Sequence, residues 1–151
     1  EESHIVIVAR DYAEKYTGTT DLEAACRIIH DRGALIAGVT DGANGSYFVW
    51  PDGTAYRCKP FPQEFVVDTT GAGDSFHGAF LVRLAKCIHK IMDTAEINMN
   101  GQEALMHCAH TELEKAAIFA SAVASLNTQG IGGRTPLPSL ETVLSLTGLE
   151  S

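Results

Sequence analysis

The chain has 151 residues and a formal net charge of -8 at pH 7, so it lacks the basic surface that nucleic-acid binding requires. It contains no apolar run long enough to cross a membrane and no signal peptide, so we expect no membrane partner. A chain of this length can bury a sufficient core, and its strand and helix patterns predict a single α/β domain.

Four cysteines are scattered along the chain and match no zinc-binding spacing (Cys26, Cys58, Cys87 and Cys108). Two of them fall on apolar helix faces, where a free thiol packs as a small hydrophobic group. We therefore expect reduced thiols in a cytoplasmic protein. The run from His107 to His110 contains residue types that bind metals, but no carboxylate pattern completes a site, so we predict no structural metal there.

The first third of the chain predicts a strand–helix–strand unit. Residues 5–8 form a short apolar run that predicts a buried strand. Thr20 to Glu23 match a capping box, and the apolar stripe that follows predicts a helix ending near Gly33. A second strand is predicted over residues 34–39, and this order of elements favours parallel pairing with a right-handed connection.

A β-hairpin is predicted next. Residues 46–50 and 54–58 are predicted strands, and Pro51-Asp52-Gly53 between them supplies typical turn residues. We expect Trp50, beside this turn, to be partly exposed. Residues 65–67 predict a further short strand directly before a glycine-rich segment.

A long helix follows the glycine-rich segment. From Asp74 onward the apolar residues recur with helical spacing, and basic residues mark the expected last turn (Lys86, His89 and Lys90). Residues 93–101 are largely polar and predict a loop. No repeat or low-complexity stretch interrupts the chain, so we expect no internal domain boundary.

The last third of the chain predicts two more helices. Thr111 to Glu114 match a second capping box, and the helix they open has a face of small residues (Ala116, Ala117, Ala120 and Ala124). Such a face allows a neighbouring backbone to approach closely. Ser139 is expected to cap a final helix that Gly148 ends.

The segment Asp68-Thr-Thr-Gly-Ala-Gly-Asp74 is chemically the most informative part of the chain. Gly71 and Gly73 allow a tight turn and a close approach of the backbone to a ligand. They precede a helix, whose free N–H groups and dipole favour an anion at its start. A carboxylate there would repel the anion, which suggests that Asp74 acts as a base toward an attacking hydroxyl group.

This segment resembles the second signature of the ribokinase-like (PfkB) family of sugar kinases, D-T-x-G-A-G-D, at every position. The resemblance implies that Gly71, Ala72 and Gly73 form an anion hole for the transferred phosphoryl group, and that Asp74 deprotonates the sugar hydroxyl. Asp68 and Thr70 match positions that bind a monovalent cation in some members. ATP and Mg2+ are the implied cofactors, with K+ as the monovalent cation and a small sugar as the substrate.

Other interpretations of the same segment are weaker. An acidic residue in a first helical turn contributes at most about 1 kcal/mol through the dipole, and that interpretation leaves the rest of the pattern unexplained. The segment lacks the Gly-Lys-Ser/Thr of a Walker A loop, and Phe76 occupies the third glycine position of a dinucleotide fingerprint. A nicotinamide-dependent oxidoreductase is therefore disfavoured.

Two further segments resemble nucleotide-binding parts of the family. The loop from Thr40 to Gly45 is similar to the family's T-x-G-x-x-G loop, which implies contacts of Thr40, Gly42 and Gly45 with the nucleotide, although an ordinary turn would use the same residues. The alanine-rich helix and the glycine loop after it flank the adenine and the cation in family members, which implies roles for Asn127 and Gly130.

Smaller features suggest a branch of the family. Gly132-Gly133-Arg134 and Phe76 to Ala79 resemble a branch that includes sulfofructose-kinase-like enzymes. A departure from the family's magnesium pattern, which some fructokinase- and ketohexokinase-like members share, points to the same side of the family. Arg134 either pairs with a phosphate or faces water, and the sequence leaves both open. The Asn-x-x-Glu pattern that organises magnesium in many members is absent, because its positions fall at Ala9 and Tyr12, with Asp11 between them.

Family members are longer than this chain, so the resemblance covers residues 1–151 as the C-terminal half of a ribokinase-like domain. The implied fold is the C-terminal part of a mainly parallel Rossmann-like sheet flanked by helices, with one β-hairpin. The N-terminal half of the family supplies most sugar-binding groups and the dimer contact. We therefore expect residues 1–151, the C-terminal half, to be inactive alone. A non-catalytic module that binds nucleotide or a partner protein is the alternative function.

Overall fold

The computed structural model describes residues 3–95, 98–133 and 137–150. Within them, one sheet has the strand order β1-β2-β3-β4: β1 (Ile5–Ala9), β2 (Ile36–Thr40), β3 (Ser46–Val49) and β4 (Ala55–Cys58). β1 and β2 are parallel, and the other two pairs are antiparallel. The α/β class, the strand–helix–strand unit and the hairpin are confirmed. The described sheet is mixed, because parallel pairing requires a crossover helix and only β1 and β2 have one between them.

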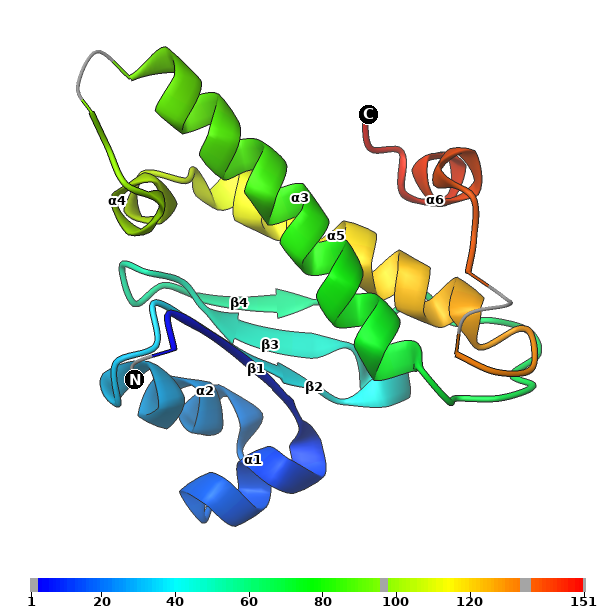
Figure 1. The fold of residues 1–151 in the computed structure, drawn as a ribbon. Helices are drawn as coiled ribbons and strands as arrows, with labels where there is room; N and C mark the ends of the chain where they lie inside the picture. Colours follow the sequence, from blue (N-terminus) through cyan, green and yellow to red (C-terminus); the bar gives the residue numbers. More distant parts are fainter. Residues whose placement is uncertain (1–2, 96–97, 134–136, 151) are drawn as a thin grey trace.

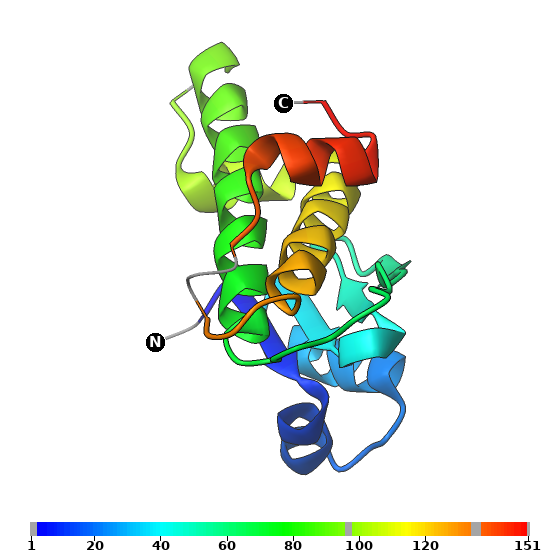
Figure 2. The same cartoon turned by 90° about the vertical axis from the view of Figure 1, so that its right-hand side faces the viewer.

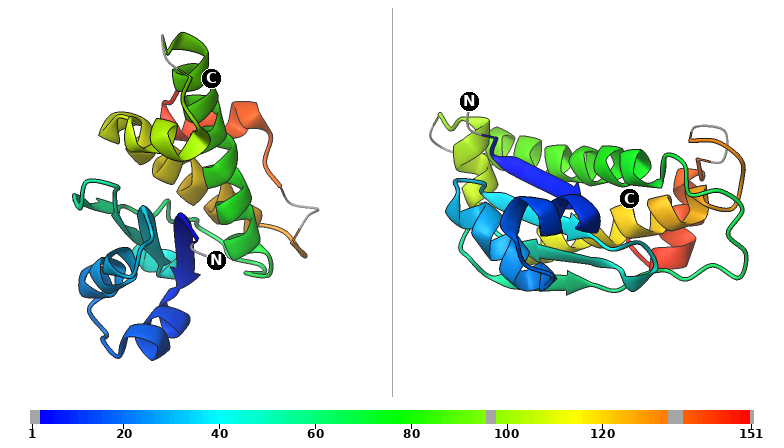
Figure 3. Two further views of the ribbon diagram at one scale, coloured as in Figure 1. Left: turned by 60° about the vertical axis from the view of Figure 1, so that its left-hand side comes forward. Right: turned by 90° about the horizontal axis from the view of Figure 1, so that it is seen from below.

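Helices cover both faces of this sheet (Figure 1; Figure 3, left). α1 (Arg10–Thr17) and α2 (Leu22–Asp31) lie on one face. α3 (Ala72–Thr94), α4 (Gly101–Met106) and α5 (His110–Asn127) lie on the other. α6 (Leu140–Thr147) packs on the side of α5 that is turned away from the sheet (Figure 2).

Alternation along β2 and β3 divides the interior into two cores. Ile36 and Phe48 point toward α3 and α5, whereas Ala37, Val39 and Val49 point toward α1 and α2. The first core holds a stack of aromatic rings, with Phe48 centred 4.9 Å from Trp50 and 5.5 Å from Phe80. The absence of a side chain at Gly38 makes room for this stack, since a Cβ there would lie 2.7 Å from Phe48 Cε1.

The helix ends follow local sequence signals in part. α6 is capped by Ser139 and ends at Gly148 in the left-handed region, as predicted. α2 is capped by Asp21, whose side chain accepts from Glu23 and Ala24, so the predicted box starting at Thr20 is wrong by one residue. The predicted box at Thr111 is also wrong, because α5 already begins at His110.

Other expectations hold only in part. α3 continues to Thr94, so its basic residues do not form the last turn. The predicted loop over residues 93–101 is confirmed at residues 95 and 98–100, whereas its two ends belong to α3 and to α4, which has a true capping box between Asn100 and Glu103. Trp50 is fully buried, because the turn brings it over the aromatic core instead of into solvent. α1 was not predicted, since Ala13 is its only buried residue and its apolar stripe is narrow.

The predicted strand at residues 65–67 does not form. Phe65, Val66 and Val67 are all more than half exposed. The Val67 N–H donates to the carbonyl oxygen of Thr128, just beyond α5, at 2.8 Å. An apolar run becomes a strand only where a neighbouring strand offers a free edge, and β4, the strand nearest in the sequence, does not pair with this segment.

Candidate active site

The glycine-rich segment ends at the N-terminus of α3, which follows Gly71 in the left-handed region (φ 77°). The N–H of Ala72 donates to the Thr69 carbonyl oxygen at 3.2 Å, whereas those of Gly71 and Gly73 have no acceptor among the described residues. Asp74 is exposed in the first turn of the helix. The start of α3 therefore presents free N–H donors, which favour an anion, beside a solvent-facing carboxylate.

The loop after α5 lies against this turn. A Cβ on Gly71 would overlap the Cα of Gly133, and a Cβ on Gly133 would lie 3.2 Å from the Cα of Gly71. Gly71 thus needs glycine both for space and for its positive φ, whereas a Cβ on Gly133 would require the facing backbone to give by a few tenths of an ångström. Two segments that are distant in the sequence meet here through their backbones.

The Asp68 carboxylate connects the same two segments, the glycine-rich turn and the loop after α5, by hydrogen bonds. It accepts hydrogen bonds from the N–H of Thr70 at 2.8 Å and from the N–H of Gly132 at 3.0 Å. These two donors, Thr70 first, hold the pKa of Asp68 below its ordinary value, because they stabilise the charged form. The observed role of this side chain is to connect the glycine-rich turn to the loop after α5.

Asn127, at the end of α5, lies beneath this turn. Its side chain is fully buried, and its Nδ2 donates to the Thr70 carbonyl oxygen at 3.5 Å. Its Oδ1 has no hydrogen-bond partner within the described residues. A buried amide oxygen without a donor is unusual, and a hydrogen-bond donor or a cation beside it would be stabilising.

The loop after β2 forms a second wall of the site. Gly42–Asn44 make one turn of 3-10 helix, and Gly45 follows with a φ of 96°. A Cβ on Gly45 would overlap the carbonyl oxygen of Cys58, so this glycine allows the loop to pack on β4. Thr40 stands at the carboxyl end of β2, at the base of the loop.

Arg10, the first residue of α1, contacts this loop through its side chain. Its guanidinium lies 3.3 Å from Asp41 and 2.7 Å from Glu14, and both carboxylates, Glu14 first, raise the pKa of Arg10. Asp41 also accepts from the Nδ2 of Asn44 at 3.1 Å. Sequence reasoning did not single out Arg10 or Asp41, because their contact joins the start of α1 to the loop after β2 through side chains alone.

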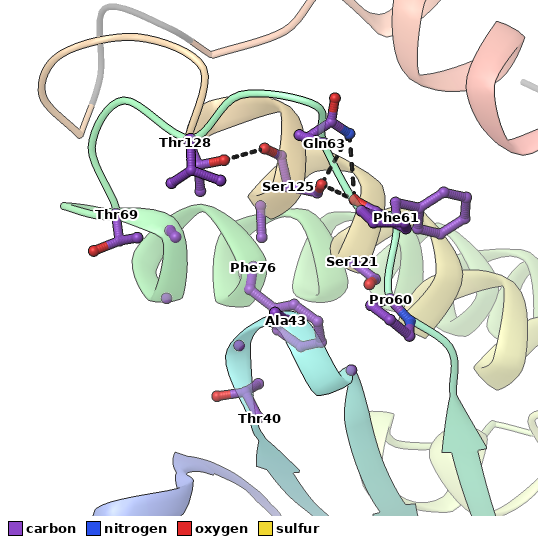
Figure 4. Close-up of a pocket in the computed structure, with 17 residues that line it drawn as sticks. Thr40, Ala43, Pro60, Phe61, Gln63, Thr69, Phe76, Ser121, Ser125 and Thr128 are labelled. Atoms are coloured by element: carbon purple, nitrogen blue, oxygen red, sulfur yellow. Dashed lines mark hydrogen bonds between the residues drawn. The ribbon is translucent and has the colours of Figure 1, made fainter.

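A cavity of about 340 Å³ lies between these segments (Figure 4). Its volume is in the range of small-molecule sites. Pro60, Phe61, Val66 and Phe76 supply apolar walls. Polar groups come from both sides: Thr40 from the loop after β2, and Gln63, Ser125 and Thr128 from the segment before the turn and the end of α5.

The comparison with known protein families agrees with this geometry. Residues 1–140 match the model described as pfkB family carbohydrate kinase. The chain belongs to the PfkB family. This family relationship accounts for the placement of the signature turn at the mouth of a long helix, next to the cavity.

Known PfkB relatives are much longer than this chain. It is 31% identical over 127 residues to the bifunctional ribokinase/ribose-5-phosphate isomerase A of Fructilactobacillus sanfranciscensis, covering 84% of the chain and 19% of that protein. It is 37% identical over 65 residues to the cytidine kinase of Thermococcus kodakarensis, covering 43% of the chain and 23% of that protein. The chain thus spans less than a quarter of either relative.

Solved structures give the same fold. The ribokinase of Arabidopsis thaliana complexed with ribose and ATP has a TM-score of 0.70 at 25% identity, covering 97% of this chain and 42% of that one. A fructokinase double mutant from Vibrio cholerae O395, with fructose, ADP and potassium bound, has a TM-score of 0.72 at 23% identity, covering 95% and 40%. The fold is therefore ribokinase-like. Because ribokinases and a fructokinase resemble it about equally, no single branch of the PfkB family is indicated.

The PfkB-type residues predicted from sequence fall into two groups. Thr40, Gly42, Gly45, Ala72 and Gly73 line the cavity. The remaining ones do not line it and surround the start of α3 or the loop after α5 (Asp68, Thr70, Gly71, Asp74, Asn127 and Gly130). Arg134 lies outside the described residues.

None of the described helices is both long and apolar enough to cross a lipid bilayer, and no cluster of three potential metal-binding side chains occurs among the described residues.

Sequence reasoning missed the residues that shape the cavity wall. The Nε2 of Gln63 donates to Ser125 Oγ at 2.9 Å, and Ser125 Oγ donates to the carbonyl oxygen of Phe61 (Figure 4). The Nε2 of Gln129 donates to Gln63 Oε1 at 2.9 Å. These bonds attach the segment before the turn to α5. The sequence signal that could have indicated this wall is the pair of prolines that flank Phe61, because prolines favour an extended backbone.

His77 connects the start of α3 to the sheet. Its Nδ1 lies 2.7 Å from the Gly73 carbonyl oxygen, and its Nε2 lies 2.9 Å from the carbonyl oxygen of Ile7 in β1. The ring therefore bridges the first turn of α3 and the first strand. His77 was noted from the sequence only as part of a branch pattern, because its partner in β1 is far away along the chain.

Proposed function

We propose that this protein is an ATP-dependent carbohydrate kinase, with Asp74 as the general base and the backbone amides of Gly71, Ala72 and Gly73 as the anion hole. The observation that carries the proposal is the start of α3, where N–H groups without an acceptor among the described residues and an exposed carboxylate adjoin a cavity in the size range of small-molecule sites. Ala72 takes part through an N–H whose present bond to Thr69 is long, at 3.2 Å.

The nucleotide would occupy the cavity with its base against the apolar walls formed by Pro60, Phe61 and Val66. Thr40, Gly42 and Gly45 would lie along the phosphates, and Asn127 and Gly130 would border the adenine side. The terminal phosphoryl group would then lie at the start of α3. Phosphoryl transfer depends mainly on positioning and on stabilisation of charge, so amide donors and one base form a sufficient minimal arrangement.

A monovalent cation such as K+ fits beside this turn. Asp68 and Thr70 offer oxygen ligands, and the buried Oδ1 of Asn127 lacks a donor among the described residues. Such a cation would stabilise the turn and add positive charge near the phosphates. The described residues offer no comparable cluster for Mg2+, and Ala9 and Tyr12 carry no carboxylate, so this ion would be held mainly by the nucleotide phosphates and water.

Further features of the whole protein are proposed from its relatives. Proteins similar to this chain are named as kinases of ribose, cytidine and 5-dehydro-2-deoxygluconate, and a fructokinase has fructose bound. We therefore propose a small sugar or a related alcohol as substrate, with the fructokinase, ketohexokinase and sulfofructose-kinase branch as the first to test. Residues 1–151 would be the C-terminal half of the kinase domain, the dimer would form through the N-terminal half, and the free thiols are consistent with the cytoplasm.

Substitution of Asp74 tests the proposal. In the complete enzyme, Asp74→Asn should lower sugar-dependent ADP release by about a hundredfold or more, because it removes the base, while nucleotide affinity stays within a few-fold. Asp93→Asn, an exposed carboxylate at the far end of the same helix, is the matched control and should have no effect. Turnover would be measured with a panel of sugars in the presence of Mg2+ and K+, and affinity by calorimetry.

The same measurements separate the alternative function. A non-catalytic module would bind ATP in calorimetry but release no ADP with any sugar, even as the complete protein. The partial coverage of the relatives supports this second candidate, because the chain spans only 19% of one relative and 42% of another, so the rest of a sugar kinase is not represented in it. Near-normal turnover of Asp74→Asn would instead remove Asp74 as the base.

A further inference from the structure

Two cysteines lie in direct contact on the side of the molecule that the proposed kinase chemistry does not use. Cys87 is on α3, and Cys108 is in the link between α4 and α5. Their Sγ atoms are 2.9 Å apart, and neither forms a disulfide. Neither residue lines the cavity.

The packing around the pair fixes this contact. Cys108 is 7% exposed and belongs to the core beneath α3 and α5, while Cys87 is half-buried and packs against the same core. The two other cysteines are fully buried elsewhere. The thiol of Cys26 donates a hydrogen bond to the Tyr47 carbonyl oxygen, and the thiol of Cys58 donates one to the Lys59 carbonyl oxygen. Cys87 and Cys108 are therefore the one close thiol pair among the described residues, and Cys87 is its accessible member.

We propose that Cys87 and Cys108 form a reversible disulfide that secures α3 to the start of α5. A disulfide requires about 2.05 Å between the sulfur atoms, so the 2.9 Å contact closes with a small change in side-chain torsions. The link would close the segment of residues 88–107, and closing a segment of this length favours the folded state by restricting the unfolded chain.

Hydrogen peroxide is the oxidant class that fits this pair, and the reaction balances in two steps. The Cys87 thiolate attacks one peroxide oxygen, the O–O bond breaks and hydroxide leaves, so that Cys87 becomes a sulfenic acid; the hydroxide takes up the proton that the thiol had released and becomes water. The Cys108 thiolate then attacks the Cys87 sulfur and displaces hydroxide, which takes up a proton and leaves as a second water. Two thiols and one peroxide thus give one disulfide and two waters, and a thiol reductant reverses the change.

The order of the two steps follows from burial. Cys87 is reachable from solvent, whereas burial is the main cause of a raised pKa at Cys108, which disfavours its thiolate in the first attack. Once Cys87 is oxidised, Cys108 reacts because it is already in contact. Cys87 is thus the reactive member of the pair, and Cys108 resolves the sulfenic acid.

The test is thiol mapping of the full chain before and after treatment with hydrogen peroxide. After denaturation and alkylation, the oxidised protein should retain free thiols at Cys26 and Cys58, and one peptide pair joined through Cys87 and Cys108 should appear that dithiothreitol removes. Cys87→Ser should leave Cys108 alkylated. Cys108→Ala should leave a sulfenic acid at Cys87 that dimedone traps, which separates loss of the partner from loss of folding.

Several outcomes would overturn the proposal. These are full alkylation of both residues after peroxide, a disulfide that maps to another pair, and stable over-oxidation of Cys87 while Cys108 remains a thiol. The cross-linked protein should also show a thermal midpoint higher by about 5 °C or more, lost again on reduction. An unchanged or lower midpoint would contradict the role assigned to the link.

Discussion

Gly71 determines the geometry of the glycine-rich turn at the level of a single residue. Its positive φ sets the direction of the chain into α3, and the absence of a side chain lets Gly133 approach. Gly73, two residues later, is helical and has open space where a Cβ would be. The two glycines of the signature therefore have different physical reasons to be glycine.

Gly71→Ala should lower the free energy of unfolding by about 2–4 kcal/mol, because alanine is disfavoured in the left-handed region and its methyl group overlaps Gly133. Gly73→Ala is the matched control and should keep or raise stability by up to about 1 kcal/mol, as expected inside a helix. Gly73 lines the cavity, so its methyl group should still weaken nucleotide binding. Urea denaturation and calorimetry distinguish these effects, and equal destabilisation by both variants would contradict the assignment.

The residues of the candidate site could be predicted from sequence only where their signal is local. Asp74, Gly71 and Gly73 lie within one short pattern, so the turn and the nearby carboxylate were predictable. The contact of Gly71 with Gly133 and the bond from Gly132 to Asp68 were not, because they join segments that are distant in the sequence. Catalytic roles of these residues stay predictions until they are tested.

At the level of elements, the site depends on the packing of α3 against α5. Phe80 and Leu84 of α3 and Ala116, Ala117 and Ala120 of α5 are all buried in one core. The predicted face of small residues is confirmed for Ala116, Ala117 and Ala120, which are buried in this core, while Ala124 is partly buried against it. The start of α3 carries Asp74 and the end of α5 borders the cavity, so this packing sets their separation.

Ala120→Leu should destabilise the protein by about 1–3 kcal/mol, because a larger side chain does not fit a fully buried position between packed elements. Ala85→Leu, at an exposed position on α3, should change stability by no more than about 0.5 kcal/mol. Thermal or urea unfolding of both variants provides the comparison. A neutral Ala120→Leu would show that α5 can shift away from α3 without cost.

The elements themselves were predicted unevenly, for physical reasons. Strands β1 to β4 and helices α2, α3, α5 and α6 have strong apolar patterns and were predicted. α1 and α4 are short and bury few residues, so their patterns were weak. The valines at residues 66–67 have high strand propensity, but no strand pairs with them, and propensity alone does not form a ladder.

At the level of the whole molecule, carboxylates join distant parts of the chain. Asp68 connects the signature turn to the loop after α5, and Asp52 of the hairpin turn lies 2.9 Å from His110 Nε2 at the start of α5. The pKa of Asp52 is lowered, mainly by the Thr54 N–H. Both carboxylates contribute to stability only while they are ionised.

Stability should therefore fall in acid. The pKa of Asp68 in the folded protein is below its ordinary value of 3.8, so its contribution is complete above that pH and is lost as the pH falls through the folded value. The thermal midpoint should be nearly constant from pH 7 to pH 5 and should drop below pH 4. Asp68→Asn should reduce that drop, whereas Asp31→Asn, at an exposed helix position, should not. A drop of the same size in all three proteins would exclude Asp68 as a cause.

The chain has a single tryptophan, and Trp50 is fully buried beside Phe48 and Tyr56. Its fluorescence is thus an intrinsic optical probe of contact between the sheet and the helices above it. Emission should move to longer wavelength in urea at the same midpoint that far-UV circular dichroism gives, if the two cores unfold together. Different midpoints would show that the two helical layers separate from the sheet independently. No dye or engineered label is needed to observe this.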